Sequence, residues 1–371
     1  MKILLIEPFF TGSHQSWALG YQQYSQHTIK ILSLPGRHWK WRMYGGAVEL
    51  AAQARKLADF QPDLLLATDM LDVTTFLALC PKEFLTIPVA LYFHENQITY
   101  PWSSTDPDIT LQRNNQYGFI NYTSALAADA LYFNSSYHRQ AFLDALPTFL
   151  GQFPDFKGLE HISSIQEKSS ELPLGINLKR FDSYQKSNAS SPPLLVWNHR
   201  WEYDKNPTAF FNTLFRLKEE GIPFQVAILG QSYSKKPPIF EEAKAILTDQ
   251  IVQFGAVDTF EKYARWLWQA DIIPITNFQD YFGQSVVEGI YCNCYPILPK
   301  RLAYPMHIPV HNHAAHFYET DDQLYVLLKD ALLNISPIRN QSVQHYVSHY
   351  DWRILAPKYD EVFAYLKKQN Q

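Results

Sequence analysis

Cysteine, net charge and long apolar runs are all scarce in this sequence, and each shortage excludes a class of protein. The three cysteines, Cys80, Cys292 and Cys294, form no C-x-x-C pair. A zinc site or a disulfide framework is therefore not expected, and reduced thiols are. With 32 Lys and Arg against 36 Asp and Glu, the net charge of −4 gives no overall attraction to nucleic acid or membrane.

The apolar runs are also too short for a secretory signal or a membrane span. The first, residues 1–6, is interrupted by Glu7, and no later run approaches the roughly 20 residues that cross a bilayer. We therefore expect no membrane association and a cytoplasmic location. A length of 371 residues, with 46% hydrophobic and 18% charged residues, predicts an ordered protein of two domains.

Short apolar runs alternate with helical patterns along the whole chain. The alternation predicts an α/β protein with two doubly wound, Rossmann-like parallel sheets. The predicted strands are 3–6, 64–67, 89–93, 130–133, 194–197, 224–229, 251–254, 271–275 and 295–298. Helices are predicted at 48–57, 135–146, 207–218 and 260–268.

The boundary between the two domains is predicted from a change in composition. Residues 153–171 lose apolar periodicity, and the polar stretch 183–193 ends in Pro192-Pro193. We expect one domain over 1–182 and a second over 193–349, facing each other across a cleft. Ligands of such sheets bind at the carboxyl ends of the strands, so the functional residues should follow directly after strands.

Two cations and two carboxylates in the second half meet this expectation. Arg200 and Lys205 follow the strand 194–197 and suit a nucleotide diphosphate, although an ordinary solvated loop would carry the same charges. Asp280 and Glu288 follow the strand 271–275 and could accept hydrogen bonds from sugar hydroxyls. The alternative is a helix cap at Asp280 and a surface position for Glu288.

The second motif also contains a predicted helix start. Gly283, Gln284 and Ser285 lie between the two carboxylates, where a helix N-terminus would offer backbone N–H groups to an anion. In the first half, Gly12 and Ser13 follow the first strand, and their backbone could approach a phosphate. An ordinary turn that needs a glycine is the alternative.

The pattern Arg-x4-Lys-x-Pro, followed by acidic-x-Phe-Gly-x4-Glu, resembles glycosyltransferase family four. The resemblance implies a GT-B fold, retention of anomeric configuration, and no metal or cofactor other than a nucleotide sugar as co-substrate. It places Arg200 and Lys205 at the donor diphosphate, a catalytic Asp280 at the transferred sugar and Glu288 at the ribose hydroxyls. It further implies donor contacts from Gly12, Ser13, Gly230, Phe282, Gly283, Gln284 and Ser285. A C-terminal helix over about 350–371 should pack on the first domain.

Two segments of the first half point to a more specific family. His94 follows the strand 89–93 and could hydrogen-bond near a reacting sugar, with a structural histidine as the alternative. The segment 36–46 interleaves three cations with tryptophans between a predicted strand and a helix, which suits phosphates and bases. A Trp-anchored loop with solvated cations is the alternative.

Together with residues 7–14 and 94–101, the segment 36–46 is similar to the tRNA-queuosine mannosyltransferase family. The resemblance implies transfer of mannose from GDP-mannose to tRNA carrying queuosine, with His94 as a catalytic residue. The acceptor-binding residues that it implies are His14, Arg37, Trp39, Lys40, Trp41, Arg42, Glu95 and Asn96. A transferase acting on a lipid or envelope glycan, or a non-catalytic module that binds nucleotide sugar or RNA, remain the alternatives.

Overall fold

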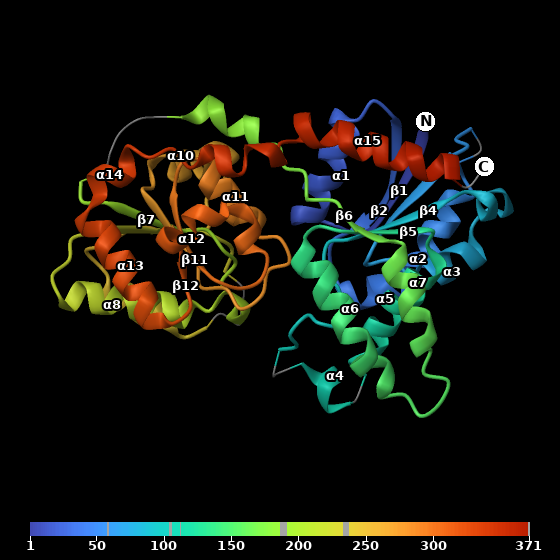
Figure 1. The fold of residues 1–371 in the computed structure, drawn as a ribbon, viewed down its shortest axis with the longest axis horizontal. Coiled ribbons are helices and arrows are strands. Elements are labelled where there is room, and N and C mark those ends of the chain that lie inside the picture. Colours follow the sequence, from blue (N-terminus) through green and yellow to red (C-terminus); the bar gives the residue numbers. More distant parts are fainter. Residues whose placement is uncertain (58, 104–105, 112, 186–190, 233–236, 370–371) are drawn as a thin grey trace. The chain divides into compact units, whose positions relative to one another are not determined.

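The computed structural model describes residues 1–371 except 58, 104–105, 112, 186–190, 233–236 and 370–371. The chain forms two compact units, one of Met1–Asn177 with Tyr350–Gln371 and one of Leu178–His349. Each unit holds one sheet of six parallel strands with helices packed around it (Figure 1). This confirms the predicted fold class of two doubly wound parallel sheets. Part of the predicted linker, 186–190, lies outside the described residues.

The sheet of the first unit has the strand order β2-β1-β3-β4-β5-β6. Its strands are β1 (Lys2–Phe10), β2 (Thr28–Pro35), β3 (Leu64–Thr68), β4 (Val89–Phe93), β5 (Ala130–Phe133) and β6 (Ser169–Glu171). Its helices are α1 (Gly12–Tyr24), α2 (Trp39–Ala54), α3 (Val73–Leu79), α4 (Pro107–Thr110), α5 (Asn115–Ala127), α6 (Ser136–Gly151), α7 (Ile162–Glu167) and α15 (Trp352–Gln369). The chain reverses its direction of winding between β1 and β3, which makes the carboxyl ends of these strands the expected ligand site.

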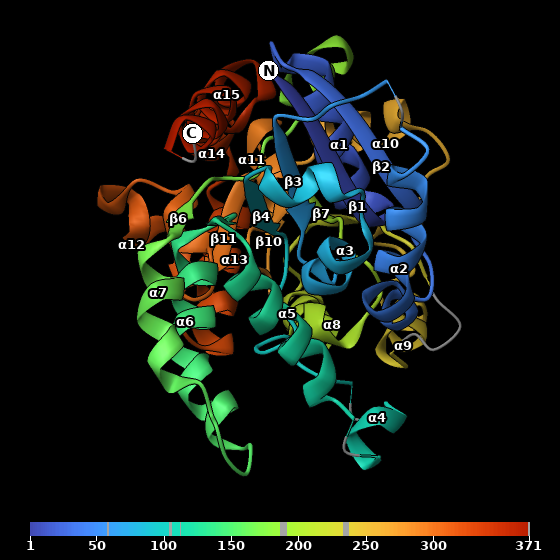
Figure 2. The ribbon, with the colours of Figure 1, turned by 90° about the vertical axis from the view of Figure 1, so that its right-hand side faces the viewer.

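Helices cover both faces of this sheet. Figures 1 and 2 show α15 beside α1 on one face and α2, α3 and α5 together on the other. The central strands β3, β4 and β5 are buried along their whole length, which explains why they are continuous apolar runs rather than alternating ones.

The C-terminal helix α15 belongs to the first unit because its side chains are built into that core. Trp352 is fully buried, and a side chain at either Gly20 or Gly175 would collide with its ring. Asp360 accepts hydrogen bonds from the Tyr21 hydroxyl at 2.8 Å and from the backbone N–H of Gln26 at 2.8 Å. Much of the high aromatic content thus serves packing in the interior.

The sheet of the second unit has the order β12-β11-β10-β7-β8-β9, the Rossmann order with its switch point between β7 and β10. Its strands are β7 (Leu194–Trp197), β8 (Gln225–Ile228), β9 (Ile251–Phe254), β10 (Ile272–Pro274), β11 (Tyr295–Pro299) and β12 (Phe317–Tyr318). Its helices are α8 (Pro207–Glu219), α9 (Ile239–Ile246), α10 (Phe260–Gln269), α11 (Gln284–Tyr291), α12 (His313–His316), α13 (Asp321–Leu333) and α14 (Ile335–Arg339).

Three expectations about the chain's organisation were wrong. The stretch 153–171 holds α7 and the sheet strand β6 rather than irregular chain. The segment 36–46 is not all loop, because α2 begins at Trp39. The turn Leu178–Tyr184 belongs to the second unit, where Trp268 donates a hydrogen bond of 2.8 Å to the backbone carbonyl of Phe181. Among the helices that the structure describes, none combines the length and the apolar character needed to cross a bilayer.

Candidate functional site

The loop after β7 and the turn after β8 come into direct contact in the second unit. Gly230 has a φ of +108°, and a Cβ atom there would lie 1.8 Å from the carbonyl oxygen of His199. A glycine is therefore required for this close approach. The backbone N–H of Trp201 donates to the carbonyl of Gln231 at 3.0 Å, which fixes the loop that carries Arg200 and Lys205.

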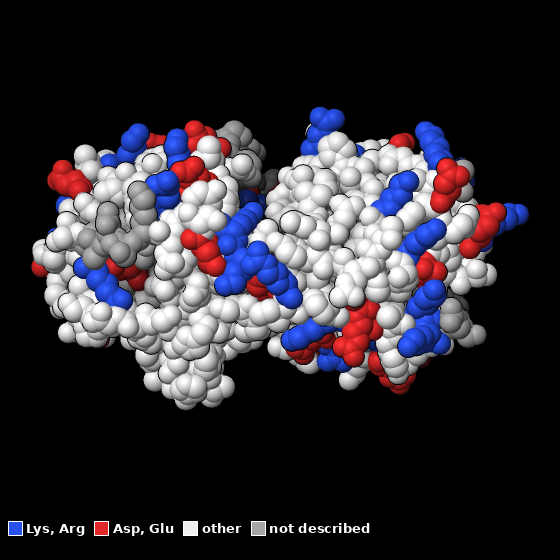
Figure 3. Space-filling model, turned by 90° about the horizontal axis from the view of Figure 1, so that it is seen from above, with Lys and Arg blue, Asp and Glu red and all other residues white. Residues whose placement is uncertain are grey.

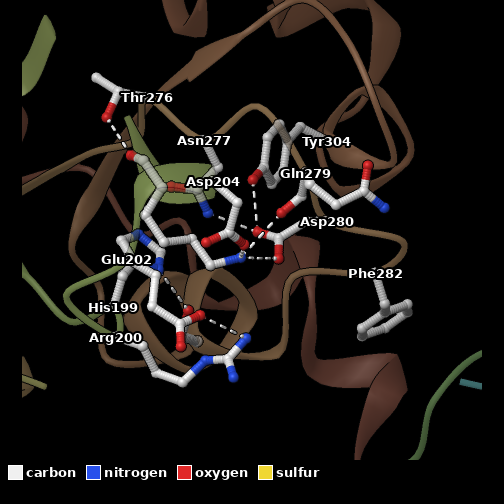
Figure 4. Close-up of polar contacts among 12 residues, drawn as sticks. His199, Arg200, Glu202, Asp204, Thr276, Asn277, Gln279, Asp280, Phe282 and Tyr304 are labelled. Atoms are coloured by element: carbon white, nitrogen blue, oxygen red, sulfur yellow. Dashed lines mark hydrogen bonds and ion pairs between the residues drawn. The ribbon is translucent and has the colours of Figure 1, made fainter. Parts of the chain in front are cut away.

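A buried ion pair joins the loop after β7 to the loop after β10. The ammonium of Lys205 lies 2.9 Å from Asp280 Oδ1, 2.9 Å from the carbonyl of Gln279 and 3.0 Å from Asp204 Oδ2. The other Asp280 oxygen accepts hydrogen bonds of 2.6 Å from Tyr304 and from the Asn277 amide. Figure 4 shows Asp280 held between these partners. The structure thus brings together two of the predicted donor-site residues.

The charges of this pair stabilise each other. Burial, the largest single influence, would raise the pKa of Asp280, but Lys205 and the other groups around the carboxylate together hold that pKa below its ordinary value. Burial would lower the pKa of Lys205, and Asp280 and Asp204 raise it instead. Burial lowers the pKa of the neighbouring His199 to about 3, so this imidazole is neutral. Lys205 therefore keeps its positive charge near neutral pH, although Asp280 and Asp204 already compensate it.

Arg200 lies differently from Lys205, although the two share one loop. Its side chain is 51% exposed and its guanidinium lies 3.3 Å from Glu202 Oε2. Figure 4 shows Arg200 beside Glu202 and away from Asp280, with Phe282 apart from the ionic cluster. Arg200 is therefore the more exposed of the two predicted cations.

The start of α11 matches the predicted helix N-terminus. Gly283 is the N-cap residue with a φ of +83°, and no side chain caps the helix there. Ser285 Oγ lies 3.1 Å from His199 Nδ1, and Phe282 is buried, with its carbonyl 2.7 Å from His307 Nε2. The first backbone N–H groups of α11 are thus left without a side-chain cap, at the switch point of the sheet.

Glu288 is buried on α11 and is not the surface residue of the alternative interpretation. Its Oε2 accepts a hydrogen bond of 2.7 Å from Tyr263, and its Oε1 accepts one of 2.9 Å from Gln284. The guanidinium of Arg180 lies 3.6 Å from Oε1. Tyr263 and Arg180 were not predicted, because they come from α10 and from the turn Leu178–Tyr184, and no sequence spacing relates them to Glu288.

In the first unit, the carboxyl ends of β1, β3 and β4 bring a second polar cluster together. His14 Nδ1 lies 3.0 Å from Glu7 Oε2, and the His14 and His94 rings lie against each other at a tilt of 34°, with centroids 4.2 Å apart. The backbone N–H of His94 donates to Asp69 Oδ1 at 2.8 Å, and Asn134 donates to the His94 carbonyl at 2.9 Å. Glu7, Asp69 and Asn134 were not among the predicted site residues.

The two histidines of this cluster differ in charge. Burial, the largest single influence, would lower the pKa of His14, but Glu7 together with Asp69 and Glu95 raises this pKa to about 9. Burial, and then the nearby His14, lower the pKa of His94 well below its ordinary value. Ligand atoms of Glu7, His14 and His94 lie within 4.8 Å of one another. The Glu7–His14 hydrogen bond already joins two of these side chains, so we interpret the group as an ion pair rather than a metal site.

Of the other ligand-binding residues predicted at the strand ends of the first unit, two are exposed and two form hydrogen bonds within their own loop. Gly12 has a φ of +52° and starts α1 without a side-chain cap, and both it and Ser13 are exposed. Asn96 is buried, and its Oδ1 accepts from the backbone N–H of Thr99 at 2.9 Å, which is a local turn. Glu95 is half-buried and accepts from the Gln97 amide at 2.8 Å.

The basic and aromatic segment is the beginning of a helix. Lys40 lies 2.6 Å from Asp106 and also contacts Asp108, while the rings of Trp39, Trp102 and Tyr117 surround its ammonium. Trp41, in contrast, is 63% exposed, Arg37 is exposed, and Arg42 donates through Nε to the carbonyl of Pro35 at 3.1 Å. Lys40 is therefore already compensated by two carboxylates, whereas Arg37 and Trp41 face solvent.

Known proteins match the sequence of both units. The family model "tRNA-queuosine alpha-mannosyltransferase N-terminal" matches residues 2–176. The chain is 33% identical to the tRNA-queuosine alpha-mannosyltransferase of Drosophila melanogaster over 375 aligned residues, covering 97% of this chain and 96% of the relative.

Solved structures show the fold. Sucrose-phosphate synthase from Thermosynechococcus elongatus aligns with a TM-score of 0.72 at 12% identity over 100% of both chains. A glycosyltransferase from Rickettsia africae aligns with a TM-score of 0.68 at 14% identity over 98% of both chains. The fold is that of the GT-B glycosyltransferases, and the chain belongs to the tRNA-queuosine alpha-mannosyltransferase family.

Proposed function

We propose that this protein transfers mannose from GDP-mannose to queuosine in tRNA, with retention of configuration and without a metal. The observation that carries the proposal is the relationship over 97% of the chain to a protein named as a tRNA-queuosine alpha-mannosyltransferase. We place the reaction in the cytoplasm, where a tRNA substrate would be met. In this proposal, the polar clusters of the two units would supply the chemistry of the transfer.

The donor would bind at the switch point of the second sheet. Lys205 is a fixed buried cation and Arg200 an exposed one, and together they would neutralise the diphosphate as the leaving group gains charge. Glu288 would accept hydrogen bonds from the ribose hydroxyls. Asp280, held by Lys205 and Tyr304, would accept one from the transferred sugar. The turn at Gly230 and the N-terminus of α11 at Gly283 would complete the phosphate contacts.

The transfer would break the bond between the sugar and the leaving phosphate and form one from the sugar to the acceptor oxygen on the same face. The departing phosphate oxygen would take the proton of the acceptor hydroxyl, so no separate protein base is required. His94, whose backbone is fixed by Asp69 and Asn134, would lie beside the positively charged sugar centre. Gly12 and Ser13, at the start of α1, would contact the phosphates from the first unit.

The acceptor would be contacted by the first unit. Figure 3 shows Lys and Arg side chains together with Asp and Glu on the face that it draws. Because the net charge is −4, we expect tRNA contacts to come from a local group. Arg37 and Arg42 would contact phosphates, and the exposed Trp41 would stack on a base. His14, Glu95 and Asn96 complete the proposed acceptor site, and Lys40 and Trp39 support it through the contacts with Asp106 and Trp102.

Mass spectrometry of nucleosides tests the proposal directly. Purified protein is incubated with a panel of nucleotide sugars and with tRNA that either carries or lacks queuosine. Of the nucleotide sugars in the panel, we expect only GDP-mannose to add a hexose to queuosine. We expect no product on tRNA that lacks queuosine. Transfer only to a lipid or envelope glycan would refute the acceptor. Donor binding with neither transfer nor donor hydrolysis would indicate a non-catalytic module instead.

A further inference from the structure

Glu7 is a fully buried carboxylate at the end of the first strand, and both of its oxygens are used. Oε1 accepts a hydrogen bond of 2.8 Å from the backbone N–H of Phe9, and Oε2 lies 3.0 Å from Nδ1 of His14. A buried carboxylate is costly unless a cation compensates it. The geometry therefore favours a charged partner at His14, with one proton of its imidazolium directed at Glu7.

The ring of His14 in turn lies against His94. The two ring centroids are 4.2 Å apart with an interplanar angle of 34°, and the indole of Trp17 meets the His94 ring edge-on at 4.8 Å. His94 cannot move away, because its backbone N–H is bound to Asp69 and its carbonyl to Asn134. Within the described chain, the one side-chain hydrogen bond of the His14 ring is that to Glu7. Its second N–H thus remains available.

The charged and titratable groups that face this ring pair come from four elements. Glu7 belongs to β1, Asp69 follows β3, Glu95 follows β4, and His138 on α6 faces His94. Against burial, which lowers it, Glu7 and then Asp69 and Glu95 raise the pKa of His14 to about 9. Burial, His14 and His138 all lower the pKa of His94. One of the two rings is thus charged at neutral pH and the other is neutral.

We propose that Glu7 is a positioning residue of the transferase: it holds His14 as an imidazolium, and that charge adds to the effect of burial in keeping His94 neutral. The inference rests on the proposed function and deepens it. A positive charge on His94 would repel the sugar centre as it becomes positive, so neutrality of His94 favours the transition state. The remaining N–H of His14 can then donate to an oxygen of the reacting groups.

The substitution Glu7→Gln tests the role of the carboxylate with little change of shape. The amide oxygen of glutamine can still accept from the Phe9 backbone, but the charge next to His14 is lost. Because an opposite charge at this distance shifts a pKa by roughly 1–3 units, the pKa of His14 should fall from about 9 toward neutrality. We expect the alkaline fall of kcat/KM to move down by about 2 pH units, with a loss of about 10-fold or more at pH 8.

A matched control is Asp63→Asn. This carboxylate also forms an ion pair in the first unit, 2.7 Å from Lys367, and accepts from the backbone N–H of Lys2, at the amino ends of the strands. Its substitution should leave the pH profile of transfer unchanged. A shift of the profile in Asp63→Asn equal to that in Glu7→Gln would overturn the assignment of the effect to the His14 pair.

Nitrogen NMR of the imidazoles measures the charge without any assay of transfer. In the parent, His14 should keep both ring protons from pH 6 to 8, and in Glu7→Gln it should titrate within that range. A neutral His14 at pH 7 in the parent overturns the inference, whether or not the protein proves to be a transferase. If Glu7→Gln does not fold, His14→Gln serves instead, because the pKa of His94 should then rise toward its ordinary value. An unchanged titration of His94 in that variant would equally refute the coupling.

Discussion

Alanine substitutions at Arg200 and Lys205 should lower activity to a similar extent but differ in their effect on stability. Both are predicted to bind the donor diphosphate, and they lie five positions apart in one loop. Arg200 is 51% exposed and contacts Glu202 at 3.3 Å, whereas Lys205 is buried among Asp280, Asp204 and the Gln279 carbonyl. The same loss of a cation therefore leaves very different groups behind.

The structure sets the size of each effect. An exposed ion pair contributes about 0–1 kcal/mol, so Arg200→Ala should change the free energy of unfolding by less than about 1 kcal/mol. Lys205→Ala leaves the buried Asp204 and the half-buried Asp280 without their cation, which should cost about 3–5 kcal/mol. Each variant also loses a charged contact to the leaving group, of about 3 kcal/mol or roughly 100-fold in kcat/KM.

Urea unfolding followed by tryptophan fluorescence, together with transfer kinetics, separates the two effects. Arg216→Ala is the matched control for Arg200, because Arg216 is 48% exposed and contacts Asp322 at 2.8 Å on the surface of the second unit. We expect Arg216→Ala to be normal in both assays. The reasoning is refuted if Arg200→Ala unfolds as easily as Lys205→Ala, or if folded Arg200→Ala keeps nearly normal kcat/KM.

Three further predictions concern the ligands. Glu288→Ala should weaken binding of the nucleoside diphosphate in calorimetry, because the ribose hydroxyls lose their acceptor; unchanged affinity would leave Glu288 as a structural partner of Tyr263. Transfer should survive EDTA, and a loss of activity that added magnesium restores would contradict metal independence. Substituting Arg37, Lys40 and Arg42 together by alanine should weaken tRNA binding and flatten its salt dependence. Because Lys40 is already paired with Asp106, the Arg37/Arg42 double variant should reproduce most of the loss, while donor affinity stays normal.

The interior strands could be predicted because burial on both faces forces a continuous apolar sequence. β4, β5 and β7 begin and end where the apolar runs do. Some edge strands do not follow this rule: β2 mixes buried, half-buried and exposed residues, and β6 and β12 have only three and two residues. Their pairing is decided by the neighbouring strand, which a local pattern does not contain.

The residues at the start of α2 favour a loop, yet they form a helix in the folded protein. His38, the N-cap residue, has a φ of 57° and provides no side-chain cap, and the helix contains the pair Gly45-Gly46. Such features favour a loop. The helix forms nevertheless, because the Trp41 ring covers Gly45 so closely that a Cβ atom there would collide with it, and Gly46 packs on Pro8.

Some site residues could likewise be predicted from the sequence, and others could be found only in the folded structure. Arg200, Lys205 and Asp280 could be found because the carboxyl end of a parallel strand is a position readable from sequence. Tyr304 and Tyr263, which bind the two predicted carboxylates, come from elements without any fixed spacing to them. The folded geometry decides which residue becomes a hydrogen-bond partner. The sequence therefore predicts the carboxylate of each pair but not the tyrosine that donates to it.

Both units place a compensated buried ion pair at the switch point of their sheet, Glu7 with His14 in one and Lys205 with Asp280 in the other. Such pairs are poor sources of stability, since desolvation cancels much of their attraction. Their benefit is that a charge already fixed in a protein interior needs no reorganisation when the reacting groups change theirs. A surface pair such as that of Arg216 with Asp322 could not do this, because water would screen it. The cost of burying these four side chains is therefore better explained by the reaction than by the fold.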